Sequence, residues 1–480
     1  MKLKDNKIYR LIAIPICVAL CFFGRFIPPF GGLSSDAIGV LCIFLGSLTL
    51  WLTIGIDWPS LLCIFSLGFL ENFGFKTAFT SSFGNETFIF LLFTFICTYS
   101  LSKTSLIKRI AIGFVSTKLA KKNGYWFIFL FLTAVLLLGL FISPSVLFVI
   151  ILPILEEIFK IAKIEKGDKV AKMLMIGLGF TVSISSGMTP IAHVFPILAM
   201  NAAHISVAPL SYMAFAIPVG LVTFLLMFLV FRLIIRPDVS RLKNVDVTSL
   251  KNDLPRLDSK DITTLVIFIV VVLLWIVPSF FKDGASDFYN AINKYGTAMP
   301  PLLGTLALCI IRIKGKPLIE ITDAFKNGVP WGSLIMCAGT LALGAAMTND
   351  AIGLKAFLQD NLGSSLSNVP EILLLVIFAL WAAVQTNLSS NMVTAQLVST
   401  VAASILVGMS ASLNLSVVVC IIGMLASFAF ATPPSMPHIA IVAGSDYCDT
   451  KDVLILGTIV MVISVVASLL IGYPLGTLVM

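Results

Sequence analysis

The chain has 480 residues, of which 58% are hydrophobic and only 12% are charged. A soluble domain carries about 25% charged residues, so this composition argues against a secreted enzyme and against a nucleic-acid-binding protein. We therefore expect an integral, multi-pass membrane protein embedded in the lipid bilayer. The formal net charge of +8 requires no anionic partner, because Lys and Arg in short cytoplasmic loops orient any polytopic protein.

The first apolar run, residues 11–28, follows a basic stretch and predicts a retained transmembrane helix within an N-terminal segment, residues 1–35. A spanning helix needs about 20 apolar residues, so the length leaves room for roughly 10 to 14 membrane segments. Several later runs are shorter than a span and are candidates for half-helices or re-entrant hairpins. The later runs are 38–54, 59–72, 87–101, 125–142, 146–162, 171–184, 205–235, 263–281, 299–312, 331–347, 370–385, 392–409, 415–430 and 453–478.

Three segments rich in Lys and Arg set the expected orientation: residues 2–10, 103–122 and 236–261. The positive-inside rule places all three, and thus the N-terminus, on the cytoplasmic side of the plasma membrane. Apolar residues at helical spacing within 103–122 also predict an amphipathic helix along the membrane surface. The polar stretch 236–261 predicts a cytoplasmic linker between two halves, residues 36–235 and 262–480.

The two halves interrupt their apolar sequence at matching places. The first break, at residues 141–146, has a counterpart at residues 388–393, and Ser390 lies 247 positions after Ser143. Each half then has a second break, at residues 183–193 in the first half and 431–438 in the second. The matched order predicts two inverted repeats built from broken helices. Broken helices at corresponding positions indicate the substrate site of a transporter.

The four breaks contain no Asp, Glu, Lys or Arg, which argues against a charged clamp. The N-terminus of a half-helix presents free N–H groups and the positive end of the helix dipole, and both suit a carboxylate. Ser, Thr and Asn side chains can cap such ends and hydrogen-bond to an anion. The candidate substrate-binding residues are Ser143, Pro144, Ser145, Thr189, His193, Ser390, Asn391, Met392, Thr432, Pro433, Pro434, Ser435 and His438.

Four motifs carry a resemblance to a known family. Residues 386–392 read Thr-Asn-Leu-Ser-Ser-Asn-Met, and residues 431–435 read Ala-Thr-Pro-Pro-Ser. Residues 83–92 (Phe-Gly-Asn-Glu-Thr-Phe-Ile-Phe-Leu-Leu) and 329–339 (Val-Pro-Trp-Gly-Ser-Leu-Ile-Met-Cys-Ala-Gly) add two further segments. Together they resemble the divalent anion/sodium symporter family of di- and tricarboxylate transporters, whose halves carry Ser-Asn-Thr and Thr-Pro-Pro-Asn motifs.

The resemblance implies an all-α protein with about 11 transmembrane helices, two re-entrant hairpins at residues 83–92 and 329–339, and two inverted repeats. It also implies a homodimer that carries a small di- or tricarboxylate by an elevator-type movement. Such a protein is not an enzyme and needs no cofactor other than sodium. The sodium ligands implied by the resemblance are Thr386, Ser389, Asn391 and Ala431.

The first half departs from the family motifs. Ser143-Pro144-Ser145 stands at the Ser-Asn-Thr position, and residues 193–196 (His-Val-Phe-Pro) stand at the Thr-Pro-Pro-Asn position. Because Pro144 offers neither an amide side chain nor an N–H, we expect the first-half sodium site to be lost. A protonated His193 or His438 would then balance the negative charge of the substrate. Unlike a bound sodium ion, this positive charge could not leave the site together with the substrate. This reasoning predicts a sodium-independent exchanger of one carboxylate for another.

Three other functions stay open at this point. A channel would need a continuous polar stripe, which the sequence does not show. A sodium-coupled dicarboxylate symporter differs from an exchanger in whether a sodium gradient alone drives uptake. A polytopic membrane enzyme is a weaker alternative, because His193 and His438 have no nearby set of Asp, Glu or Cys with which to build a metal site.

Overall fold

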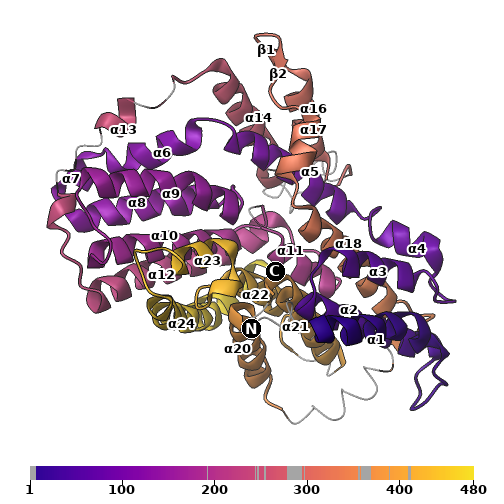
Figure 1. Ribbon diagram of the computed structural model, residues 1–480. Coiled ribbons are helices and arrows are strands. Elements are labelled where there is room, and N and C mark those ends of the chain that lie inside the picture. The colour runs from indigo at the N-terminus through magenta and orange to yellow at the C-terminus, as the bar shows by residue number, and fades with distance from the viewer. Residues whose placement is uncertain are drawn as a thin grey trace.

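The computed structural model describes residues 7–480 except 192, 244, 246–247, 253, 255, 278–293, 297, 355–356, 358–368, 389 and 409–411. Nearly all of its elements are helices, which confirms the expected all-α fold (Figure 1). Within the described residues the strands are β1 (Arg312–Ile313) and β2 (Lys316–Pro317), which pair antiparallel in one short hairpin.

The helices of the first half follow one another in this order: α1 (Lys7–Phe23), η2 (Gly24–Phe26), α2 (Ser35–Thr53), α3 (Asp57–Leu67), α4 (Gly74–Ser81), α5 (Glu86–Ser102), α6 (Leu106–Val115), α7 (Lys118–Lys122), α8 (Gly124–Gly139), α9 (Pro144–Ile161), α10 (Lys169–Gly187), α11 (Phe195–Ala202) and α12 (Pro209–Ile234).

The helices of the linker and the second half are η3 (Ser240–Leu242), α13 (Thr248–Asn252), α14 (Ser259–Ile276), α16 (Met299–Ile310), α17 (Ile321–Asp323), η5 (Ala324–Gly328), α18 (Trp331–Met347), α20 (Glu371–Leu388), α21 (Asn391–Gly408), α22 (Leu415–Ser427), η6 (Pro433–Ser435), α23 (Pro437–Ala443), α24 (Thr450–Ala467), η7 (Ser468–Gly472) and α25 (Tyr473–Val479).

Five of the described helical segments are long and apolar enough to cross a membrane by themselves: Gly74–Ser102, α10, α12, α20 and Thr450–Val479. A sixth is the pair formed by Ile321–Gly328 and Trp331–Met347, which meet at a bend of 78°. Shorter apolar helices of 10–17 residues accompany them. The chain is therefore a polytopic membrane protein, and the total of about 11 spans stays a prediction.

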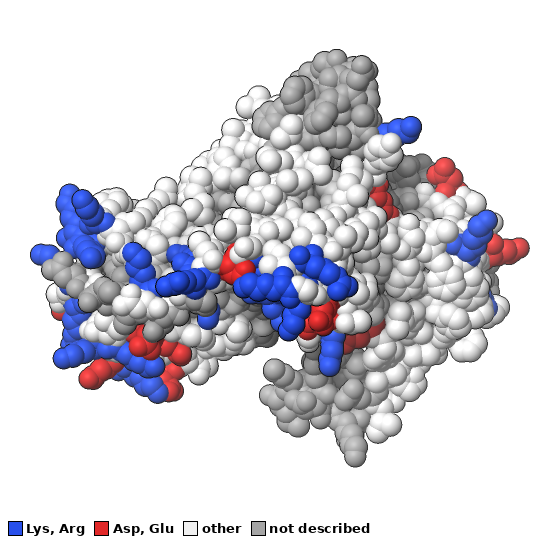
Figure 2. Space-filling model, turned by 90° about the horizontal axis from the view of Figure 1, so that it is seen from above, with Lys and Arg blue, Asp and Glu red and all other residues white. Residues whose placement is uncertain are grey.

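The charged side chains are unevenly distributed over the surface. Figure 2 shows Lys and Arg gathered toward the end of the molecule where α7 lies in Figure 1, while most of the remaining face carries no charge. The amphipathic helix expected within 103–122 forms as α6. Its apolar residues Ile107, Ala111 and Ile112 are buried against α8 and α9, so the apolar face of α6 covers protein. The cytoplasmic position of this end, and of the N-terminus, stays a prediction.

Of the two re-entrant hairpins that the family resemblance implied, the one at residues 83–92 is not bent back on itself, whereas the one at residues 329–339 coincides with a sharp bend of the kind that a broken span or a re-entrant loop has. At residues 83–92 the chain continues from α4 into α5 as one segment of 29 residues, and the Asn85 side chain caps α5 by accepting from the N–H of Thr87 at 2.9 Å. At residues 329–339 the chain bends by 78° beside Pro330, which has no N–H to continue a helix. Other pairs joined by short turns are α8 with α9 and α20 with α21, and each pair packs along its own length.

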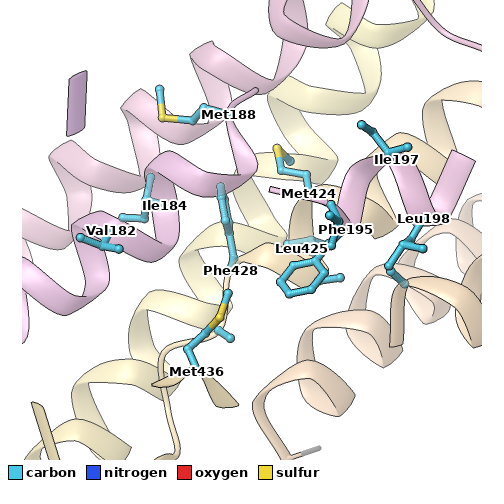
Figure 3. Close-up of a cluster of buried hydrophobic side chains, with 14 of the residues drawn as sticks. Val182, Ile184, Met188, Phe195, Ile197, Leu198, Met424, Leu425, Phe428 and Met436 are labelled. Atoms are coloured by element: carbon cyan, nitrogen blue, oxygen red, sulfur yellow. The ribbon is translucent and has the colours of Figure 1, made fainter. Parts of the chain in front are cut away.

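The two broken helices, α10 with α11 and α22 with α23, cross at the centre of the fold. α11 packs against α21 and α22, whereas α23 packs against α9 and α10, so each short helix lies within the opposite half. Gly423 permits the close approach, because a Cβ at this position would lie 2.7 Å from the Cα of Pro196. Figure 3 shows the apolar side chains that fill the crossing, Phe195 and Phe428 among them.

Candidate functional site

A cavity of about 1030 Å³ lies where the hairpin tips, the helix breaks and the bend before α18 meet. It contains most of the residues that the sequence placed in a substrate site, together with several that it did not. The described lining residues are Trp51, Thr53, Ile54, Gly55, Ile56, Asp57, Phe95, Thr98, Tyr99, Ser102, Ile142, Ser143, Pro144, Ser145, Val146, His193, Val194, Phe195, Asn327, Gly328, Val329, Pro330, Ser333, Leu388, Ser390, Asn391, Met392, Ser435, Met436 and Pro437.

The tip of the first hairpin, between α8 and α9, reaches the cavity through Ser143, Pro144 and Ser145. Ser143 holds the N-cap position of α9, yet its hydroxyl makes no capping hydrogen bond. Pro144 follows at the first helical position, where the backbone N–H of any residue would lack a helical partner. The tip therefore offers two serine hydroxyls and the free N–H groups of the first turn of α9 to a ligand.

The tip of the second hairpin lines the same cavity through Ser390, Asn391 and Met392. The Oγ of Ser390 accepts a capping hydrogen bond from the N–H of Val393 at 3.4 Å. Asn391 is only 5% exposed, and its Nδ2 has no hydrogen-bond partner among the described residues. A buried amide donor without an acceptor is unfavourable, so this position suits a ligand that supplies one.

The second-half break makes several hydrogen bonds to Asn387, which was not predicted as a site residue. Its Oδ1 accepts hydrogen bonds from two successive backbone N–H groups, the second that of Ala431, both at 2.7 Å. Its backbone carbonyl accepts another from the hydroxyl of Thr432. The hydroxyl of Thr386 donates to the carbonyl of Ala426 at 2.7 Å. Asn387 thus satisfies two N–H groups of the unwound segment, that of Ala431 among them, while Thr386 contacts the last turns of α22.

The remaining predicted residues of this half divide into two groups. Ser435 lines the cavity, whereas Thr432 and Pro433 are not among its described lining residues. Ser389 lies outside the described residues, and the side chain of Pro434 does as well.

The first-half break is held by a related contact. The hydroxyl of Thr189 donates to the carbonyl of Leu140 at 2.6 Å, as that of Thr432 does to the carbonyl of Asn387. Thr189 thus makes in the first half the kind of contact that Thr432 makes in the second, whereas the match of residues 193–196 to the Thr-Pro-Pro-Asn motif stays a prediction. Thr189 is fully buried and is not among the described lining residues. Because Leu140 stands where the second half has Asn387, the first break lacks a side-chain amide to hold it.

The two predicted histidines lie in different surroundings. His193 lines the cavity, and its ring centroid lies 3.8 Å from that of Phe195. Its Nδ1 accepts a hydrogen bond from the N–H of Val194 at 3.0 Å, and an accepting nitrogen carries a lone pair in place of a proton. His438 is fully buried and is not among the described lining residues. The expectation that a protonated histidine balances the substrate's charge therefore has no support in this geometry.

The sequence analysis missed several polar residues of the cavity wall. Asp57, the first residue of α3, is the one acid among the described lining residues, which include neither Lys nor Arg. Tyr99 of α5 also lines the cavity, and its hydroxyl donates to Oδ2 of Asp323 at 3.1 Å. Lys103 pairs with the same oxygen at 3.7 Å. Asp57 and Tyr99 stand next to or inside apolar runs with no break in them, so no signal in the sequence connected them with the hairpin tips.

Comparisons with known proteins agree with this architecture. A family model described as the sodium:sulfate symporter transmembrane region matches residues 5–480. The chain is 24% identical to the sodium-dependent dicarboxylate transporter SdcS of Staphylococcus saprophyticus subsp. saprophyticus, over 98% of this chain and 92% of the relative. It is 25% identical to an uncharacterized transporter of Methanocaldococcus jannaschii, over 70% of this chain and 71% of the relative.

One solved structure shares the fold. The crystal structure of the YdaH transporter of Alcanivorax borkumensis superposes with a TM-score of 0.55 over 97% of each chain, at 15% sequence identity. At this identity the likeness concerns the arrangement of the helices alone.

Proposed function

The chain belongs to the family of the sodium:sulfate symporter transmembrane region, and from this premise we propose that it is a sodium-coupled transporter of small dicarboxylates. The cavity between the hairpin tips is the proposed substrate site. The name of the staphylococcal relatives, sodium-dependent dicarboxylate transporter, supports both the class of substrate and the coupling ion.

The observation that carries the proposal is the meeting of two helix N-termini, those of α9 and α21, at one cavity that also contains the unpaired Nδ2 of Asn391. Each N-terminus contributes a partial positive charge and free N–H donors. A dicarboxylate carries two negative groups, so each hairpin tip can receive one of them. Ser145 at the first tip and Asn391 at the second would donate hydrogen bonds to these groups.

The second-half break supports sodium as the coupling ion. The hydroxyl of Thr386 gives its proton to the carbonyl of Ala426, so the lone pairs of its oxygen stay available to a cation. The carbonyl of Ala431 and the Oδ1 of Asn391 would add further neutral oxygens, the kind of ligand that unwound helices use to hold sodium. The chemistry of these three oxygens suits a sodium ion. Asn391 would contact the ion through its oxygen and the substrate through its nitrogen, which links the two binding events.

Exchange of one carboxylate for another is the second candidate function. The observation in its favour is the first-half break, where Leu140 and Pro144 replace side chains that could hold or bind a cation. The second-half break keeps its oxygens, however, and the contact of His193 Nδ1 with the N–H of Val194 favours a neutral ring at this residue over the fixed positive charge of the exchange hypothesis. Sodium-coupled uptake is therefore the function that the geometry supports better.

We also propose that the hairpins and the crossing helices move as one body. α11 contacts α21 and α22, and α23 contacts α9 and α10, so both halves contribute to the same central unit. Around it, α3 packs on α18 and α5 packs on α16, which suits a frame that stays in place. An elevator-type movement of the central unit within this frame would carry the substrate across the membrane.

The test is counterflow in proteoliposomes, with a panel of succinate, malate, citrate and sulfate outside and unlabelled substrate inside. Sodium-dependent exchange of label with a dicarboxylate, and weak exchange with sulfate, is the expected result. Equal counterflow with and without sodium would instead favour the exchanger. Absence of counterflow with every anion of the panel, for a protein that remains monodisperse, would overturn the assignment of the substrate class.

A further inference from the structure

His438 lies away from the cavity, and its surroundings point to another role. We propose that His438 is a positioning residue that holds the unwound segment between α22 and α23 through Ser183 of α10, and thereby sets the affinity of the second-half break for sodium. This inference rests on the proposed sodium coupling and adds to it a residue from the opposite half of the chain.

Two hydrogen bonds connect the three parts. The Nε2 of His438, on α23, lies 2.8 Å from the Oγ of Ser183, and the same Oγ lies 3.0 Å from the carbonyl oxygen of Ala429. Ala429 belongs to the unwound segment that Asn387 holds from its other side. His438, Ser183 and Ala429 are all fully buried, so water cannot replace either bond.

The direction of the two hydrogen bonds follows from the number of protons. A carbonyl can only accept, so Ser183 must give its single hydroxyl proton to Ala429. The Oγ of Ser183 must then accept from His438, which places the proton of the imidazole on Nε2. In the neutral ring this tautomer leaves Nδ1 with a lone pair. The ring of Phe148, 5.8 Å away between centroids, packs beside the imidazole.

The position of the unwound segment matters because its carbonyls, with Thr386, form the proposed sodium site. Asn387 holds the N–H groups at the end of this segment, and Ser183 holds the carbonyl of Ala429. Without the second contact a buried carbonyl would lose its partner, which is unfavourable, and the segment would be free to rotate. The site would then meet the ion with oxygens that are no longer in place.

The described residues of the first half show no comparable contact. Where α23 brings His438 against α10, α11 brings Pro196 against α22, so close that a Cβ on Gly423 would lie 2.7 Å from the proline Cα. Proline has neither a side-chain donor nor a backbone N–H. Among the described residues, the positioning contact is found at the break that keeps the oxygen ligands, which agrees with a role in cation binding at that break.

The experiment compares His438→Leu, His438→Gln and Ser183→Ala with the unmodified protein in full-length form. Ser186→Ala is the matched control, because its hydroxyl is buried on the same helix and donates within that helix to the carbonyl of Ser183 at 2.8 Å. Two quantities are measured: the sodium concentration for half-maximal dicarboxylate counterflow, and the stabilisation of the purified protein by sodium alone in a thermal melt.

His438→Leu and Ser183→Ala should raise the half-maximal sodium concentration about tenfold, the usual effect of one lost buried hydrogen bond. The half-saturation for dicarboxylate at saturating sodium should change less than about twofold. Glutamine can place an amide donor close to the Nε2 position, so His438→Gln should recover most of the sodium affinity. Ser186→Ala should behave as the unmodified protein does.

Three results would overturn the inference. The first is an unchanged sodium requirement in Ser183→Ala, which remains decisive if His438→Leu fails to fold. The second is an equal shift in Ser183→Ala and Ser186→Ala. The third is an unmodified protein whose counterflow and thermal melt do not respond to sodium, and this result would overturn the proposed coupling as well. In the first two cases the proposed function stands and only the role of His438 falls.

Discussion

Replacing Asn391 with alanine tests the substrate site at the point where the structure leaves a donor without an acceptor. The Nδ2 of Asn391 is buried at the second hairpin tip and has no partner among the described residues, so a bound carboxylate would supply its first hydrogen bond. A hydrogen bond to a charged group contributes about 1.5–3 kcal/mol. Since about 1.4 kcal/mol corresponds to a factor of ten, Asn391→Ala should raise the half-saturation for dicarboxylate roughly ten- to a hundredfold.

The assay is counterflow of labelled dicarboxylate at saturating sodium, with thermal melts of the purified variants alongside. Stability should not fall, because alanine removes a buried polar group that makes no hydrogen bond through its nitrogen. Ser404→Ala is the matched control, since its hydroxyl lies on the same helix and donates to the carbonyl of Thr400 at 2.9 Å. A half-saturation within about twofold of the unmodified protein, for a variant of normal stability, would refute the placement of the carboxylate at this tip.

Three further predictions follow from the same geometry. Ser145→Ala at the first tip should raise the half-saturation for dicarboxylate roughly tenfold with little effect on sodium, and an equal effect on both ligands would contradict this placement. Asn387→Leu should abolish sodium dependence and lower the melting temperature, because two buried N–H groups lose their acceptor; a sodium response like that of the unmodified protein would contradict it. Gly423→Ala should destabilise the protein by about 1–3 kcal/mol through overpacking, whereas Gly113→Ala, which meets no atom within 4 Å, should not.

The residue types at 141–146 and 388–393 were sufficient to predict two breaks in the apolar sequence, but not that each break is the turn of a helix pair. Ser143 and Ser390 stand beside Pro144 and Asn391 in otherwise apolar sequence, and polar or helix-breaking residues within lipid must be buried in protein or line a cavity. Both tips do line one cavity. The boundaries of the repeats, residues 36–235 and 262–480, stay predictions, as do the homodimer and the plasma-membrane location.

That α8 turns back into α9, and α20 into α21, could not be recognised from the sequence, because which helices turn back depends on contacts between the halves. Asn387 is an example of a residue whose role could not be predicted from the sequence. It stands between the apolar run 370–385 and the break at 388–393, as the last residue but one of α20, and its importance lies in hydrogen bonds to residues more than 40 positions away. His438 was predicted at the substrate site because it follows a Thr-Pro-Pro motif, yet the crossing of α23 with α10 turns it toward Ser183.

The orientation of the chain is a prediction that labelling can test. The positive-inside rule places the 236–261 linker in the cytoplasm, and an odd number of spans would leave the C-terminal residue, Met480, on the opposite face. Labelling of single cysteines from each side should therefore reach the linker and the C-terminus from opposite sides. Accessibility of both from the same side would contradict the inverted repeat.

The measurement that tests the central claim most directly is uptake of labelled dicarboxylate into proteoliposomes that contain no substrate, driven by an inward sodium gradient. Sodium-coupled transport predicts accumulation above the external concentration and its collapse when the gradient is dissipated by a sodium ionophore. Matched vesicles with potassium in place of sodium should take up no label. The opposite result is uptake that occurs only into vesicles preloaded with unlabelled carboxylate and is equal in potassium and in sodium. This result would contradict sodium-coupled transport and establish exchange in its place.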